Sequence, residues 1–309
     1  MTGARITLAA LLFAATAAAQ AQVPPERAAK IRALGQSMDP AAGTAPYRDA
    51  LGPEFFEGMT ISRGIAYGSD PKHALDVYMR DGAEAAKRPV LVFVHGGGFR
   101  GGSRSGQPYP DNIPAWAVHE GMVAVSIDYR LAPENPWPAG ANDLSSALQW
   151  VRMHIARYGG HPDRIVLLGH SAGANHVADY IAHTKVQGEE FAGVKGAALL
   201  SPLYVEAMTE GAPHIYYGND AALQTADPLL AGLRASDVPL FFATAEFDPD
   251  NMQEFGEKAR ARLCEQAERC PGFVHLADHN HFTEGMALGT EDKSLSGPLV
   301  AWMKANGVF

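Results

Sequence analysis

Six short apolar runs, separated by segments with helical spacing, are the feature that most limits the folds open to this chain. The runs are rich in β-branched residues, and most are apolar on both faces, as strands buried inside a parallel sheet are. The clearest helical pattern is the apolar stripe of Leu144, Leu148, Val151 and Ile155. Strands that alternate with helices predict an α/β fold with a mostly parallel central sheet and helices on both faces. The runs are residues 89–95, 122–128, 164–169, 194–200, 238–245 and 272–276.

The composition excludes several other classes of protein. The 309 residues include 25 Lys and Arg against 34 Asp and Glu, a formal net charge of −9, and 47% of them are hydrophobic. Such a chain can bury enough apolar surface to offset its conformational entropy, so a disordered protein is not expected. The chain has no stretch rich in Lys or Arg, which argues against nucleic acids and membrane surfaces as partners.

The first 21 residues look like a secretory signal peptide. A single basic residue, Arg5, precedes an apolar run at residues 6–19, and Ala19, Gln20 and Ala21 form an A-x-A cleavage site. The run is too short and too rich in alanine to span a bilayer comfortably. We therefore expect export to the periplasm or the medium, and a mature chain that forms one domain over residues 22–309.

The N-terminal part of this domain differs in pattern from the rest. Residues 25–56 read as helical turns broken by Pro and Gly, and two antiparallel strands are expected at residues 60–67 and 73–79. The segment 22–59 is either a small cap over a binding cleft or a plain N-terminal arm, and the cap is the favoured interpretation.

Cys264 and Cys270 are the only cysteines of the chain. An exported protein meets an oxidising compartment, so an even number of cysteines favours a disulfide over two free thiols. The bridge would close a short loop, which limits its contribution to stability. Neither cysteine is predicted to be a nucleophile.

A nucleophile is predicted at the turn between the strand 164–169 and the helical pattern that follows. The turn reads Gly169-His170-Ser171-Ala172-Gly173 and matches the pattern G-x-S-x-G. In this context the turn strains the backbone of the serine and lifts its hydroxyl above the sheet, and the two glycines allow the crowding. The alternative is a glycine-rich turn that contains a serine without a role.

A second glycine motif, His95-Gly96-Gly97-Gly98, follows the strand 89–95. Glycines at this place let backbone N–H groups face a substrate oxygen that becomes negative during attack. A phosphate-binding loop is the alternative, but the Lys-Ser/Thr pair of such loops is missing.

Together with the sequence YRLAPE at 129–134, these two motifs resemble the hormone-sensitive lipase branch of the α/β-hydrolases, over about residues 70–285. The resemblance implies an oxyanion hole formed by the N–H groups of Gly97, Gly98 and Ala172. It also implies that His95 braces the glycine loop and does not react.

The chain departs from that family at two positions. Many members have an acidic residue before the nucleophile and a second glycine after the motif, whereas this chain has His170 and Ala174. The pattern with histidine is similar to a subgroup of small bacterial carboxylesterases and kynurenine formamidases.

A serine nucleophile needs a base, and the base needs an acid that fixes its tautomer. In this family the chain order is serine, acid, histidine. The segment after the strand 238–245 resembles the family's acid turn and points to Asp248, with Asp250 and Glu246 as alternatives.

Two histidines follow the last strand, His279 and His281. His281 precedes Phe282, as the family's histidine commonly precedes Phe, and it is favoured as the base. The other histidine is expected to form hydrogen bonds at the edge of the cleft. A metal site built from His275, Asp278 and these two histidines is disfavoured, because no partner elsewhere has matching spacing.

The sequence thus predicts an exported serine hydrolase that cleaves short-chain or aryl carboxylic esters through an acyl enzyme, without metal or cofactor. An amidase or arylformamidase is the alternative reaction, and a catalytically silent binding module is the alternative class of protein. Phe99 is predicted to contact the substrate, because it adjoins the glycine loop. Asp143 is interpreted as the N-terminal cap of the helix that carries Leu144.

Overall fold

In the residues that the structure describes, the central sheet has eight strands in the order β1-β2-β4-β3-β5-β6-β7-β8. The pairs β1–β2 and β2–β4 are antiparallel, and all other neighbours are parallel. This confirms the predicted α/β fold with a mostly parallel sheet. The strands are β1 (Met59–Ala66), β2 (Ala74–Arg80), β3 (Arg88–Val94), β4 (Val123–Ile127), β5 (Gly160–His170), β6 (Val194–Leu200), β7 (Leu240–Phe247) and β8 (Gly272–Asn280).

The computed structural model describes residues 23–83, 85–107, 109–202, 214–219, 226–265 and 270–309. The predicted signal peptide lies outside these residues. None of the helices in the described ranges combines the length and the apolar character that crossing a membrane requires. The helices are α1 (Pro25–Leu34), α2 (Pro40–Thr44), α3 (Asn112–His119), α4 (Ala139–His154), α5 (Ala172–Ala182), α7 (Ala226–Ala235), α8 (Asp250–Leu263), α9 (Thr283–Met286) and α10 (Ser296–Ala305). The 3₁₀ turns are η1 (Ala45–Tyr47), η2 (Pro53–Phe56), η3 (Ile155–Tyr158), η4 (Thr184–Val186) and η5 (Glu189–Gly193).

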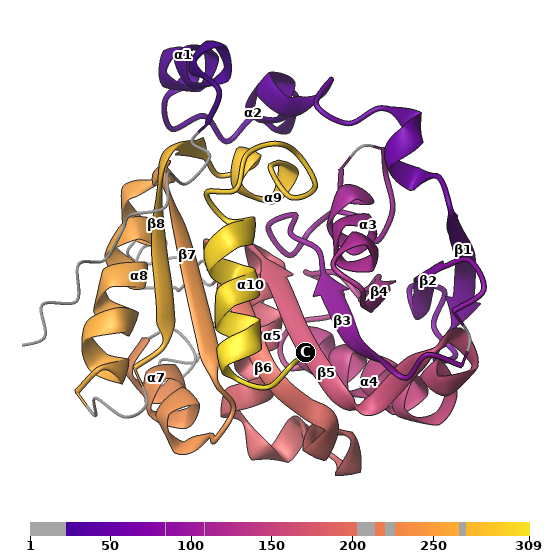
Figure 1. The fold of residues 1–309 in the computed structure, drawn as a ribbon. Helices are drawn as coiled ribbons and strands as arrows, with labels where there is room; N and C mark the ends of the chain where they lie inside the picture. The colour runs from indigo at the N-terminus through magenta and orange to yellow at the C-terminus, as the bar shows by residue number, and fades with distance from the viewer. Residues whose placement is uncertain (1–22, 84, 108, 203–213, 220–225, 266–269) are drawn as a thin grey trace, which may run out of the picture.

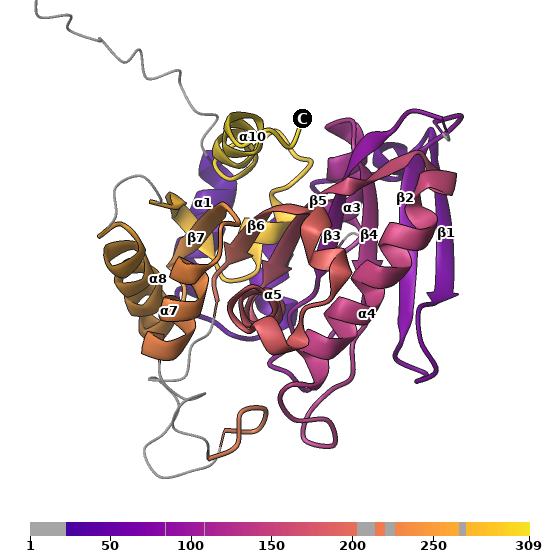
Figure 2. The ribbon, with the colours of Figure 1, turned by 90° about the horizontal axis from the view of Figure 1, so that it is seen from below.

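Helices cover both faces of the sheet, as Figures 1 and 2 show. Helices α4, α5, α7 and α8 pack on one face and share one apolar core with it. Helices α3 and α10 pack on the other face and share a second core. The central strands are buried on both faces because each contributes side chains to both cores, which explains their uninterrupted apolar runs.

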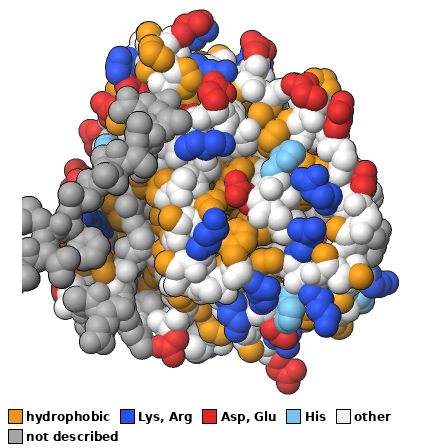
Figure 3. Space-filling view, viewed as in Figure 1, with side chains coloured by type: hydrophobic (Ala, Val, Ile, Leu, Met, Phe, Trp, Pro, Cys, Tyr) orange, Lys and Arg blue, Asp and Glu red, His pale blue; other side chains and the backbone are white. Residues whose placement is uncertain are grey.

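Large apolar side chains are therefore mostly inside the molecule. Among the described residues, the exposed large hydrophobic side chains are Met38, Met153 and Phe309. Acidic and basic side chains are scattered over the face shown in Figure 3, with apolar atoms between them.

Asp143 does not cap a helix, so that part of the sequence interpretation is wrong. It lies inside α4, which begins at Ala139, and its carboxylate is buried. Oδ1 is 2.6 Å from the guanidinium of Arg130 and 3.0 Å from Nε2 of His73. Arg130 and His73, from two other segments, thus hold this side chain. A capping aspartate would instead accept a hydrogen bond from a backbone N–H group of its own helix.

The N-terminal segment forms the expected helical turns and lies beside the carboxyl ends of the strands, above β8 and α9 in Figure 1. Asn280 donates a hydrogen bond to the carbonyl oxygen of Gly43 at 3.2 Å, and Arg32 forms an ion pair with Asp278 at 2.6 Å. The segment therefore packs against the carboxyl end of β8. Its role as a cap stays a prediction.

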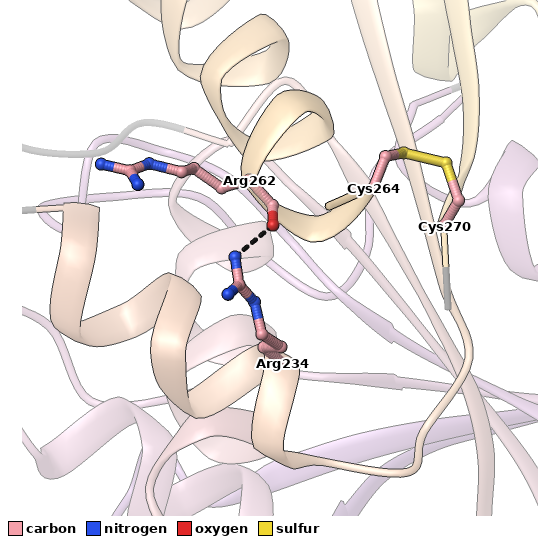
Figure 4. The surroundings of a disulfide bond; sticks show 4 residues. All are labelled: Arg234, Arg262, Cys264 and Cys270. Carbon is pink, nitrogen blue, oxygen red and sulfur yellow. Dashed lines mark hydrogen bonds between the residues drawn. A yellow bond between two sulfur atoms is a disulfide. The ribbon is translucent and has the colours of Figure 1, made fainter. Parts of the chain in front are cut away.

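Cys264 and Cys270 are joined by a disulfide with a sequence separation of 6 (Figure 4). The bridge ties the end of α8 to the start of β8. It lies at the amino end of β8, whereas the predicted catalytic residues lie at the carboxyl ends of the strands.

Replacing both cysteines with serine is expected to lower the free energy of unfolding by at most about 2 kcal/mol, because so short a loop loses little entropy when it is closed. Urea denaturation of the variant and of the wild type, each with and without a thiol reductant, measures this effect. The reduced wild type should match the variant. A loss of catalytic activity in the variant would contradict the conclusion that the bridge lies too far from the predicted catalytic residues to affect them.

Candidate active site

The backbone around Ser171 has the geometry of a nucleophile elbow. Ser171 lies between the end of β5 and the start of α5, with φ 55° and ψ −126°. A non-glycine residue at positive φ is strained, and such strain is frequent at functional sites. A Cβ atom at Gly169 would lie 2.5 Å from the carbonyl oxygen of Gly173, and one at Gly173 would lie 2.1 Å from that of Val94. The two glycines are therefore required by close packing, as the motif predicts.

Asp248 and His281 meet at the same edge of the sheet. Asp248 follows β7, His281 follows β8, and these strands are parallel neighbours, so their carboxyl ends lie side by side. Nδ1 of His281 lies 2.9 Å from Oδ1 of Asp248, and both side chains are buried. The other oxygen of Asp248 accepts hydrogen bonds from the hydroxyl of Ser201 and, at 2.7 Å, from the amide of Ala245.

These contacts fix the tautomer of His281. A carboxylate accepts hydrogen bonds, so Nδ1 carries the hydrogen that faces Asp248, and Nε2 of the neutral ring keeps its lone pair. Burial lowers the pKa of His281 below its ordinary value, although Asp248 opposes this effect. The ring is therefore neutral at neutral pH and able to accept a proton.

The elbow and the His281 loop are in direct contact through His170. Nε2 of His170 donates a hydrogen bond to the backbone carbonyl of His281 at 2.8 Å, and the two rings have centroids 4.8 Å apart. The residue before Ser171 thus holds the loop that carries the candidate base.

His279, the alternative base, points into a different environment. It is fully buried, with Nε2 2.8 Å from the hydroxyl of Ser294 and 3.1 Å from Oδ2 of Asp292. Nδ1 lies 3.2 Å from the hydroxyl of Thr283. Both nitrogens are occupied away from Asp248, so the expectation that this histidine lies at the edge of the cleft is wrong.

The alternative acids also face elsewhere. Asp250 accepts a hydrogen bond from the side chain of Gln36 at 2.7 Å, and Glu246 accepts one from the amide of Asp278 at 2.7 Å. Neither carboxylate forms a hydrogen bond or an ion pair with His281 in the described part of the chain.

The glycine loop after β3 lies against the nucleophile. A Cβ atom at Gly96 would lie 2.9 Å from Cβ of Ser171. No carbonyl or side chain of the described residues accepts the N–H groups of Gly97 and Gly98, and Ala172 opens helix α5. Unused N–H groups of this kind are what an oxyanion hole requires.

His95 contacts the loop as a brace would. Its Nδ1 lies 2.6 Å from the carbonyl oxygen of Gly96, and Nε2 lies 3.5 Å from Oδ1 of Asp128. Its backbone carbonyl accepts a hydrogen bond from the hydroxyl of Tyr129 at 2.8 Å.

Gly97→Ala is expected to lower kcat roughly 10²- to 10³-fold, the effect of losing an oxyanion donor. Gly97 has φ 128°, and a Cβ there would lie 2.2 Å from the carbonyl oxygen of Gly101, so the loop must shift. Steady-state kinetics on an ester measures the effect. Gly82→Ala is the matched control, because Gly82 also has positive φ (71°) but no atom within 4 Å of its Cβ position. An unchanged kcat in Gly97→Ala would contradict the role of the loop.

Phe99 is buried, with 2% of its surface exposed. Its ring stacks on Tyr216 at a centroid distance of 4.8 Å, and both belong to a small apolar cluster that includes Ala172. Phe99 therefore belongs to the buried cluster that contains the candidate oxyanion residue Ala172. Its contact with a substrate stays a prediction.

The disfavoured metal site is not assembled. Nδ1 of His275 lies 3.1 Å from the hydroxyl of Thr244, and Asp278 pairs with Arg32. Within the described ranges, metal-binding atoms come together in one group instead, His170, His281 and Glu284. There Nε2 of His170 carries a hydrogen toward a carbonyl, so it offers no lone pair to a metal.

Sequence reasoning assigned no role to Glu284 or Ser201, and it noted His170 only as a departure from the family pattern. Glu284 and Ser201 belong to no motif, and the fold alone brings them to the site.

A model of the alpha/beta hydrolase fold family matches residues 91–276, more than half of the chain. The chain belongs to the alpha/beta hydrolase fold family. The matched region contains the serine turn and the Asp248 segment.

Two relatives and one solved structure illustrate the similarity. Esterase LipC of Mycobacterium tuberculosis is 38% identical over 113 residues, which cover 37% of this chain and 28% of that protein. Carboxylesterase NlhH of the same species is 48% identical over 88 residues, 28% of this chain and 27% of that protein. A thermostable esterase from Pseudomonas putida has a TM-score of 0.64 at 21% identity, covering 92% of this chain and 96% of that one. The chain thus spans about a quarter of the length of these two curated relatives, and the solved structure shows the fold alone.

Proposed function

We propose that the chain is a serine hydrolase that cleaves small carboxylic esters through an acyl enzyme. The observation that carries the proposal is the buried contact between His281 and Asp248, beside a strained serine turn and unused N–H groups. The names of the sequence relatives, esterase and carboxylesterase, support an ester as the substrate.

The geometry suggests the steps of the reaction. Ser171 Oγ attacks the ester carbonyl carbon while Nε2 of His281 takes the hydroxyl proton. Asp248 holds the ring and stabilises its charged form, and the N–H groups of Gly97, Gly98 and Ala172 bind the oxyanion. The tetrahedral intermediate collapses, the leaving alcohol takes the proton from His281, and water then repeats the attack on the acyl enzyme.

Esters of short acids or of aryl compounds are the proposed substrates, because the sequence contains no long apolar lid segment. An amidase or arylformamidase would use the same residues, but no relative named above supports it. The predicted signal peptide and the Cys264–Cys270 bridge support export to the periplasm or the medium.

The test combines a covalent probe with a substrate panel on the purified protein. A fluorophosphonate probe should label Ser171, as peptide mass spectrometry would show, and p-nitrophenyl acetate should be hydrolysed faster than longer acyl esters. N-formylkynurenine and an aryl amide should be poor substrates. Absence of both labelling and ester hydrolysis would favour a binding module instead.

A further inference from the structure

Two acid–imidazole pairs lie next to each other at the candidate active site. The first is the pair of Asp248 and His281 described above. In the second, Nε2 of His170 lies 3.3 Å from Oε1 of Glu284, and both side chains are buried. Glu284 reaches this position from α9, which begins two residues after His281.

Burying the carboxylate of Glu284 costs folding free energy. Its side chain has no exposed surface, and within the described ranges neither carboxylate oxygen has a hydrogen bond of good geometry. A carboxylate in such a place is strongly destabilised unless a positive charge lies near it. Two imidazole rings are the groups near it that can supply one.

The distances bring Glu284 close to the candidate base as well as to His170. A carboxylate oxygen of Glu284 and one ring nitrogen of each histidine all lie within 4.8 Å of one another. Opposite charges at this separation attract strongly in a buried site, where water screens them poorly. An imidazolium at His281 would therefore interact with two carboxylates, Asp248 and Glu284.

We propose that His170 and Glu284 are positioning residues for His281. His170 holds the backbone of His281 through its Nε2–H, and Glu284 stabilises the imidazolium that forms at His281 during acyl transfer. This inference rests on the proposed function and adds a second carboxylate to it. No bond to the substrate is made or broken by either residue.

The pair responds to pH near neutrality. Burial raises the pKa of Glu284 to about 7, and His170 opposes this shift. Burial by itself would lower the pKa of His170, but Glu284 raises it above the ordinary value. The titratable groups that face Glu284 are His170 at the end of β5, His281 after β8, Asp248 after β7 and Tyr109 before α3.

The sign of the effect follows from these charges. Below pH 7 Glu284 is mostly a neutral carboxyl group and offers His281 little attraction. Above pH 7 it is a carboxylate, and a protonated His170, which would repel the imidazolium, also becomes less common. The stabilisation of the reacting state therefore grows as the pH rises through about 7.

Glu284→Gln tests this directly, since glutamine keeps the shape of the protonated side chain. The ratio of wild-type to variant kcat should be on the order of 10- to 100-fold at pH 8.5 and near unity at pH 5.5. A purely structural role would give the same ratio at every pH, and that result would overturn the inference.

Asp292→Asn is the matched control. Asp292 is also a buried carboxylate paired with a histidine, but its partner is His279 at the end of β8 and not His281. Its variant is expected to lower stability and to change kcat by a factor that does not depend on pH. The same pH-dependent ratio in both variants would overturn the inference.

An NMR titration of protein labelled with ¹³C-histidine supplies a readout that needs no activity. In Glu284→Gln the pKa of His170 should fall, because only the backbone carbonyl of His281 and the charge of Asp248 then oppose the effect of burial. An unchanged His170 titration would overturn the inference. A wild type without ester hydrolysis would overturn the proposed function, and an active wild type with a constant kcat ratio would overturn the inference alone.

Discussion

Replacing Ser171 with alanine removes nearly all ester hydrolysis, with kcat falling roughly 10⁵- to 10⁶-fold. The loss is this large because the change removes the attacking hydroxyl itself from the turn where the positive φ of 55° places it. Binding of the substrate by the remaining groups is unaffected, so KM should change much less than kcat. Stopped assays with p-nitrophenyl acetate and burst-phase measurements check both expectations.

The fold of this variant should stay intact. Alanine and serine are equally strained at this φ, so urea denaturation of Ser171→Ala should give a free energy of unfolding close to that of the wild type. Ser146→Ala, in which a half-buried serine of α4 is replaced, controls for background esterase carried through purification. Full activity in pure Ser171→Ala protein would contradict the assignment of Ser171 as the nucleophile.

His281→Gln is the second change with a very large expected effect, a fall in kcat of roughly 10⁵-fold. Glutamine can still donate a hydrogen bond to Asp248 but cannot act as a base near neutral pH. The matched variant is His279→Gln, two residues earlier at the end of β8 and also buried. Parallel kinetics on the two proteins decide which histidine is the base.

His279→Gln should lose stability and keep most of its activity per folded molecule. Asp292 has a pKa lowered to about 2: burial raises it, but the interactions with His279, Tyr47 and Ser294 together outweigh burial. A lowered pKa of an acid means that the pair contributes stability above the unfolded pKa near 4 and loses it as the pH falls through about 2. The difference in stability between this variant and the wild type should therefore shrink in acid. A catalytic loss in His279→Gln equal to that of His281→Gln would contradict the assignment.

The positions of the strands and of the nucleophile turn could be predicted because their signals are local. Strands buried on both faces need uninterrupted apolar runs, and β6 has the bounds predicted for it. The turn at Ser171 needs glycines on both sides, since a Cβ at Gly169 or Gly173 would collide with backbone. Each of these requirements is met by residues that are neighbours in the sequence.

Side-chain partners could not be predicted in the same way. Asp143 is a short polar residue near a predicted helix start, and only the fold shows that Arg130 and His73 approach it. His279, at the end of β8, and His281, just after it, are two residues apart, and their local patterns do not show which one faces Asp248. That outcome depends on the register between β7 and β8 and on the path of the loop after β8.

The sequence by itself determined the α/β architecture, the strained serine turn and the glycine loop, because backbone conformation and burial are encoded by residue type and spacing over short stretches. Only the tertiary structure decided that His281 contacts Asp248, that His279 contacts Asp292, and that Glu284 joins His170 beside the site. These pairings join residues from different strand ends, or assign neighbouring side chains to different partners. These side-chain contacts depend on how the parallel strands bring distant loops together at one edge of the sheet. No short stretch of sequence specifies that arrangement.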